Sequence, residues 1–177
     1  EVIHLGHNCA AEAVVDAAIQ EDAQGIAVSS YQGGHIEYFK YMHDLLRKKG
    51  AGHIRIYGGG GGVIVPREIE ELHAYGIARV FSPEDGRRLG LDGMIDLMMA
   101  ECDFSTIEKA GLPDAGALNM ADFQTVARLI TLAEAGGAGA NGSGTNLLDD
   151  VRARAAQVTR RIPVIGMTGT GGAGKSS

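Results

Sequence analysis

The first hundred residues of the sequence predict an α/β fold with a doubly wound parallel sheet. Short apolar segments alternate with amphipathic helical patterns about every 25 residues, which is typical of strand–helix–strand units. A turn of small or polar residues follows each of three successive segments. Because crossovers in such sheets are nearly always right-handed, these turns meet at one edge of the sheet, where open α/β sheets bind ligands.

Each element has its own local signal. Helical periodicity predicts amphipathic helices after the first three strands and a closing helix after the fourth. Pro66 can begin the third helix and Gly76 can end it. The predicted strands are 2–5, 25–28, 54–57 and 78–81, the helices lie around 14–19, 36–46, 67–75 and 94–98, and the turns are Ser29–Gly34, Gly58–Gly62 and Ser82–Gly86.

Five consecutive glycines, Gly58 to Gly62, follow the third predicted strand. Glycine costs conformational entropy, so such a run needs a reason. One reason is a tight turn with positive φ angles, and another is a surface on which a large flat or phosphorylated ligand lies directly on the backbone. A flexible loop is the alternative, but the helix that begins at Pro66 favours a short ordered turn.

Composition excludes several classes of protein. The chain has 177 residues, enough for one domain and part of a second, and its net charge of −6 argues against nucleic-acid binding. Cys9 and Cys102 match no metal or redox spacing, which favours a reducing, cytoplasmic setting. No apolar run approaches the roughly 20 residues of a membrane span, and no signal peptide is present. Because the chain lacks an initial Met and stops within a motif, we expect a fragment.

The pattern changes after residue 102. Apolar spacing predicts one helix around 123–133 and another around 147–158, separated by the glycine-rich segment 135–144, which is typical of a flexible linker. A new strand is predicted at 163–168. We therefore divide the chain into an α/β domain at 1–102, a helical linker at 103–161 and the start of another domain at 162–177.

The segment Gly169–Ser176 matches the phosphate-binding pattern G-x-x-x-x-G-K-[ST] directly after a predicted strand. Backbone N–H groups of such a loop surround phosphate oxygens, Lys175 places a charge on the β and γ phosphates, and Ser176 offers a hydroxyl to Mg²⁺. The shorter pattern G-x-G-x-x-G also fits but leaves Lys175 and Ser176 unexplained. The predicted nucleotide-binding residues are Gly169, Gly171, Gly172, Ala173, Gly174, Lys175, Ser176 and Ser177.

Three motifs together resemble the cobalamin-binding domain of the adenosylcobalamin-dependent acyl-CoA mutases. They are Ser29-x-Tyr31 with Gly33-Gly34-His35, then the glycine turn, then Phe81-Ser82-Pro83. The resemblance implies a flavodoxin-like sheet of five strands whose first strand is missing here, with the motifs lining the nucleotide tail of the cofactor. Tyr31 stands where that family has Leu. The implied cobalamin-binding residues are Ser29, Ser30, Tyr31, Gly33, His35, Gly58, Gly59, Gly60, Gly61, Gly62, Phe81, Ser82 and Asp85.

The cobalt-ligating motif of that family, D-x-H-x-x-G, is absent. Glu71–Gly76 comes close but falls within a predicted helix, so we interpret His73 as a helix residue. The resemblance implies that the cobalt-ligating His lies before Glu1, on the missing first strand. None of the six histidines present is expected to bind the cobalt ion.

The order of the segments is similar to that of the fused isobutyryl-CoA mutases, in which a G-protein chaperone domain separates the cobalamin domain from a substrate barrel. This resemblance implies radical interconversion of isobutyryl-CoA and n-butyryl-CoA, with GTP gating cofactor loading. It implies adenosylcobalamin, GTP and Mg²⁺ as cofactors, an acyl-CoA substrate held by a further domain, and a homodimer. Two alternatives stay open: another acyl-CoA mutase of the methylmalonyl-CoA type with a fused chaperone, and a cobalamin-binding sensor or carrier coupled to an NTPase.

Overall fold

The computed structural model describes residues 1–111, 122–136 and 143–158. The predicted strand at 163–168 and the phosphate-binding motif Gly169–Ser176 lie outside these residues. So do most residues of the predicted glycine-rich linker.

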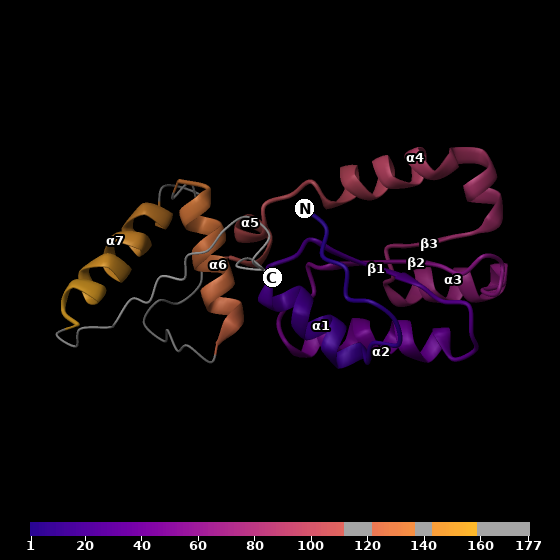
Figure 1. Ribbon diagram of the computed structural model, residues 1–177, viewed down its shortest axis with the longest axis horizontal. Coiled ribbons are helices and arrows are strands. Elements are labelled where there is room, and N and C mark those ends of the chain that lie inside the picture. Colours follow the sequence, from indigo (N-terminus) through magenta and orange to yellow (C-terminus); the bar gives the residue numbers. More distant parts are fainter. Residues whose placement is uncertain (112–121, 137–142, 159–177) are drawn as a thin grey trace, which may run out of the picture.

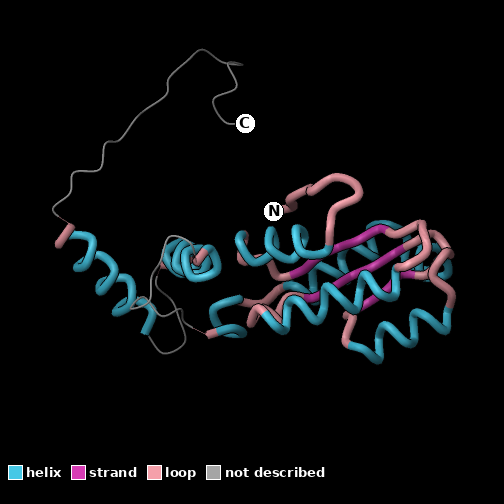
Figure 2. The backbone as a smooth tube through the Cα atoms, turned by 90° about the horizontal axis from the view of Figure 1, so that it is seen from below, coloured by secondary structure: helices cyan, strands magenta, loops and turns pink. Residues whose placement is uncertain are grey.

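A parallel sheet of three strands forms the centre of the described fold (Figure 2). Its strands are β1 (Gly25–Ser29), β2 (Arg55–Gly59) and β3 (Arg79–Phe81), in that spatial order. Each strand is followed by a helix before the next begins, which confirms the predicted α/β class with parallel strands.

The strand predicted at 2–5 is wrong. Residues 1–10 form no strand, and Val2 is 92% exposed. A strand is held by hydrogen bonds to a neighbouring strand, and among the described residues no strand pairs with the outer edge of β1. Apolar composition alone therefore does not order this segment as a strand.

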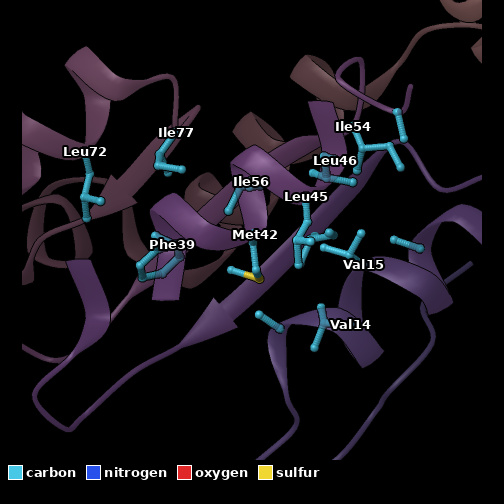
Figure 3. Packing of buried hydrophobic residues seen from close by; sticks show 14 of the residues in the cluster. Val14, Val15, Phe39, Met42, Leu45, Leu46, Ile54, Ile56, Leu72 and Ile77 are labelled. Carbon is cyan, nitrogen blue, oxygen red and sulfur yellow. The ribbon is translucent and has the colours of Figure 1, made fainter. Parts of the chain in front are cut away.

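Three helices pack on one face of the sheet and enclose the core (Figure 3). They are α1 (Ala11–Gln20), α2 (His35–Lys48) and α3 (Pro66–Tyr75). As predicted, α3 begins at Pro66, and Gly76 follows its last residue with a φ of +121° that a residue with a side chain rarely adopts. The buried core residues include Val14, Val15, Phe39, Met42, Leu46, Ile56, Leu72 and Ile77.

The helix α4 (Pro83–Cys102) lies on the opposite side of the sheet from α1 and α2 (Figure 1). The predicted turn at Ser82–Gly86 is wrong, because α4 already begins at Pro83. Ser82 Oγ accepts a hydrogen bond from the N–H of Asp85, and the Asp85 carboxylate accepts one from the N–H of Ser82, so the two residues form a capping box. A break at Gly90, with φ of +67°, interrupts the helix.

Hydrogen bonds fix the carboxyl end of α4 to the sheet. Glu101 accepts a bond of 3.0 Å from the Tyr57 hydroxyl on β2 and a bond of 2.9 Å from the guanidinium of Arg79 on β3. These contacts show that the side chains of Tyr57 and Arg79 point to the α4 side of the sheet.

Residues after 102 form further helices, as predicted for the linker. They are α5 (Thr106–Ala110), α6 (Phe123–Glu134) and α7 (Ser143–Ala156). Asp122 caps α6 by accepting a hydrogen bond from the N–H of Thr125. The glycine-rich segment predicted at 135–144 extends too far by two residues, because Ser143 and Gly144 already belong to α7.

Candidate functional site

The register of the sheet places three of the predicted site residues side by side. Ser29 pairs with Gly59, and Gly59 pairs with Phe81, so these residues form one row across the strands at their carboxyl ends. Successive side chains of a strand point to opposite faces. Because Tyr57 points to the α4 side, Gly59 two residues later faces the same side. We call these three residues the Ser29–Gly59–Phe81 row.

At Ser29 and Gly59 this row presents small groups and backbone on the α4 side of the sheet, and the half-buried Phe81 completes the row on β3. Ser29 is exposed, and Ala27, two residues earlier on β1, is exposed as well. A Cβ atom added to Gly59 would have only the carbonyl oxygen of Phe81 within reach, at 4.0 Å. The open space above Gly59 is thus a surface on which a flat ligand can contact the backbone directly.

Packing within the protein requires glycine on either side of Gly59, at Gly58 and Gly60. A Cβ on Gly58 would lie 2.6 Å from the ring of Phe39, which fills the core on the opposite face. A Cβ on Gly60 would lie 2.2 Å from the carbonyl oxygen of Ser30. Both distances are too short for any side chain, so these glycines allow the backbone of β2 to lie against α2 and against the turn after β1.

The last two glycines of the run form the turn itself. Gly61 and Gly62 have φ angles of +56° and +96°, and the N–H of Val63 donates to the carbonyl of Gly60 at 3.0 Å. A Cβ on Gly61 would in addition meet the exposed ring of Tyr31 at 2.8 Å. The need for a tight turn with positive φ angles therefore explains Gly61 and Gly62, whereas an open backbone surface is found at Gly59.

The turn after β1 lies directly against the end of β2. The N–H of Ser30 donates a hydrogen bond of 2.8 Å to the carbonyl of Gly59. Gly33 and Gly34 have open space where a Cβ would lie, and Gly34 has a φ of +85° just before α2 begins. Ser30 thus lies directly beside the Ser29–Gly59–Phe81 row, and Tyr31 and Gly33 follow it in the same turn.

His35 is buried, with 7% of its surface exposed. Its Nδ1 lies 3.2 Å from the carbonyl oxygen of Gln32, and its Nε2 lies 3.0 Å from the carboxylate of Glu68 on α3. Burial alone favours the neutral ring, but these two hydrogen bonds and the charges of Glu68 and Glu37 raise the pKa of His35. The sequence predicted that His35 lies at the carboxyl-terminal edge of the sheet, but it did not indicate the partner of His35 on α3.

Ser82 and Asp85 lie next to the row, at the start of α4. Hydrogen bonds from the hydroxyl and N–H of Ser82, together with Arg88, lower the pKa of Asp85 to about 2. The Asp85 carboxylate is therefore ionised and is used to cap α4. Its role in the described structure is to fix the start of the helix that borders the row.

Sequence reasoning missed two residues of this site. Ala27 faces the same side as Ser29, and the alternation of side chains along a strand could have indicated this. Glu68 pairs with His35 across 33 residues of sequence, and nothing in the local pattern indicates that pairing.

Among the described residues, no group of three or more His, Cys, Asp or Glu side chains could hold a metal ion. His73 lies within α3, as predicted, and its Nε2 accepts a hydrogen bond of 3.0 Å from the N–H of Val80 on β3. Of the helices that the structure describes, none has the length and apolar character needed to cross a membrane.

Comparison with known proteins gives the family of this α/β unit. Residues 1–87 match the family described as B12 binding domain, which places this α/β unit among the B12-binding domains. All 177 residues align with proteins named fused isobutyryl-CoA mutase, at 61% identity in Geobacillus kaustophilus, 54% in Cupriavidus metallidurans and 51% in Nocardia farcinica. The chain belongs to the family of the fused isobutyryl-CoA mutases, and it spans 16% of the length of each of these relatives.

Proposed function

We propose that the α/β domain binds cobalamin, with the nucleotide tail of the cofactor lying on the Ser29–Gly59–Phe81 row. The open space above Gly59 is the observation that carries this proposal. The row lies at the carboxyl ends of parallel strands, where open α/β sheets bind ligands, and small groups there let a bulky ligand approach the backbone. The match of residues 1–87 to B12-binding domains supports the same ligand.

The chain's own residues would bind and orient the cofactor. Ser29 offers its hydroxyl group within the row, and the exposed ring of Tyr31 offers an apolar wall. Adenosylcobalamin, when bound, supplies a radical through homolysis of its Co–C bond. The cobalt-ligating His that the resemblance implies is not among the residues of this chain.

We further propose that the full-length protein isomerises isobutyryl-CoA to n-butyryl-CoA and that a G-protein domain gates cofactor loading. The names of the relatives and the phosphate-binding motif Gly169–Ser176 support this proposal. GTP and Mg²⁺ are the proposed ligands of Lys175 and Ser176. A further domain would hold the acyl-CoA, and the protein would act as a homodimer.

Substitution of Gly59 tests the binding proposal. Gly59→Val in the full-length protein places a branched side chain in the open space, and valine is favourable in a strand. We expect adenosylcobalamin no longer to co-elute with this variant on gel filtration. Gly52→Ala is the control, because Gly52 lies before β2, at the opposite end of that strand from the row. Unchanged cofactor retention by Gly59→Val would contradict the assignment of the row.

A further inference from the structure

The side chain of His35 connects the two turns that border the Ser29–Gly59–Phe81 row. Its Nδ1 contacts the carbonyl of Gln32, in the turn after β1, at 3.2 Å. Its Nε2 contacts Glu68 Oε2 at 3.0 Å, and the same carboxylate oxygen accepts a hydrogen bond of 3.0 Å from the N–H of Val65, at the end of the turn after β2. One imidazole ring therefore ties residues 30–34 to residues 60–65.

Both neighbours of the ring are hydrogen-bond acceptors. A neutral imidazole carries a single N–H, so it can donate to the Gln32 carbonyl or to the Glu68 carboxylate, but not to both. Only the doubly protonated ring makes both contacts at once. Glu68 on α3 and Glu37 on α2 are the charged groups that act on His35, and the Val65 N–H and His35 lower the pKa of Glu68, so its carboxylate stays ionised.

We propose that His35 is a positioning residue for cobalamin binding: its doubly protonated ring, held between Gln32 and Glu68, keeps the two turns at the separation that the cofactor's tail requires. This inference rests on the proposed function above. The two contacts are complete when the pH lies below the ordinary pKa of histidine, and one of them is lost as the pH rises through the raised pKa of His35. Cobalamin affinity should therefore fall with rising pH.

The chain contains a matched control pair. Lys40 on α2 forms an ion pair with Glu71 on α3, so it joins the same two helices as His35 and Glu68 do. Both of these side chains are more exposed than that of His35, and their ion pair joins residues of the two helices only. Glu71→Gln thus removes an ion pair between α2 and α3 while leaving the two turns connected.

The test measures the dissociation constant of adenosylcobalamin for the full-length protein at about pH 6 and about pH 9, on either side of the histidine titration. For the unmodified protein we expect affinity about tenfold weaker at the higher pH, the lower end of what a charge-assisted hydrogen bond contributes. Glu68→Gln keeps an acceptor for the Val65 N–H but removes the charge. We expect it to bind about tenfold more weakly at the lower pH, with a flattened pH profile.

His35→Gln should flatten the profile in the same way, and it decides the question if Glu68→Gln does not fold. Glu71→Gln should bind like the unmodified protein at both pH values. Unchanged affinity and an unchanged pH profile in both Glu68→Gln and His35→Gln would overturn the inference while leaving the proposed function intact. Weakened binding with the unmodified pH profile would also overturn it. Failure of the unmodified protein to bind adenosylcobalamin would instead overturn the proposed function.

Discussion

Thr131 on α6 donates a hydrogen bond of 2.9 Å to the carboxylate of Asp22, although 109 residues separate them in the sequence. Asp22 follows α1 and is 8% exposed, and it also accepts a hydrogen bond from Thr106 on α5. The guanidinium of Arg128 lies 3.9 Å from the same carboxylate. These contacts attach two helices of the linker to the α/β domain through one buried carboxylate.

We expect Asp22→Asn to loosen this attachment. Asparagine tolerates the positive φ of +47° at this position, so the substitution removes mainly the charge that the two hydroxyl groups and Arg128 share. The free energy of opening α6, measured by hydrogen exchange, should fall by about 2 kcal/mol. Asp149→Asn is the control, since its ion pair with Arg152 is exposed. Equal protection of α6 in both variants would contradict the role of Asp22.

Alanine should have different effects on stability at Gly58 and at Gly59. A Cβ on Gly58 meets the Phe39 ring at 2.6 Å, whereas a Cβ on Gly59 meets open space. Gly58→Ala should lower the free energy of unfolding by about 1 to 3 kcal/mol through overpacking. Gly59→Ala should leave it within about 0.5 kcal/mol of the unmodified value. Adding Phe39→Leu to Gly58→Ala should restore part of the loss in urea unfolding, and failure to do so would exclude the clash as its cause.

His73→Ala should destabilise the domain without changing cobalt coordination. The substitution leaves the N–H of Val80 without its acceptor, at a cost of about 1 to 2 kcal/mol. The absorbance spectrum of bound adenosylcobalamin should be unchanged. A spectral shift of the kind caused by loss of the lower ligand would show that His73 binds the cobalt ion. The side chain of His4 has no partner in β3, so His4→Ala is a suitable control for both measurements.

The capping box of α4 should be sensitive to acid. The pKa of Asp85 is lowered to about 2 in the folded protein, so its stabilising contribution is present above its unfolded pKa and is lost as the pH falls from about 4 towards 2. At neutral pH Asp85→Asn should cost about 1 to 2 kcal/mol in urea unfolding. The difference between this variant and the unmodified protein should shrink as the pH falls below about 4 and disappear below about pH 2. A difference that does not depend on pH would mean that the charge of Asp85 is not responsible.

Lys175→Ala in the full-length protein should abolish GTP hydrolysis. In the proposed function Lys175 would supply a charge that backbone amides cannot replace, and such a contact contributes several kcal/mol to a transition state in a site that excludes water. Mutase activity of enzyme already loaded with adenosylcobalamin should be largely retained, because the radical reaction needs no phosphate. Both activities should be assayed on one preparation. Equal loss of both would contradict a separate chaperone role for the phosphate-binding domain.

Most helices and strands of the described residues could be predicted from local sequence patterns. Helical periodicity, Pro66 and Gly76 predicted α3, and apolar segments predicted β1 to β3, because these signals act between residues close together in the chain. The turn residues also indicated which edge of the sheet carries the candidate site. The segment 2–5 shows the limit of such signals, since it has strand composition but no neighbouring strand.

Contacts between distant parts of the chain determine which of these groups meet. The register of the sheet put Ser29, Gly59 and Phe81 in one row, and the packing of Phe39 separated the role of Gly58 from that of Gly59. The same holds for the contact of His35 with Glu68. Each of these relationships joins residues that are distant in sequence or on opposite faces of one strand. Strand pairing and side-chain packing fix them, and local conformational preference does not specify which residues are paired.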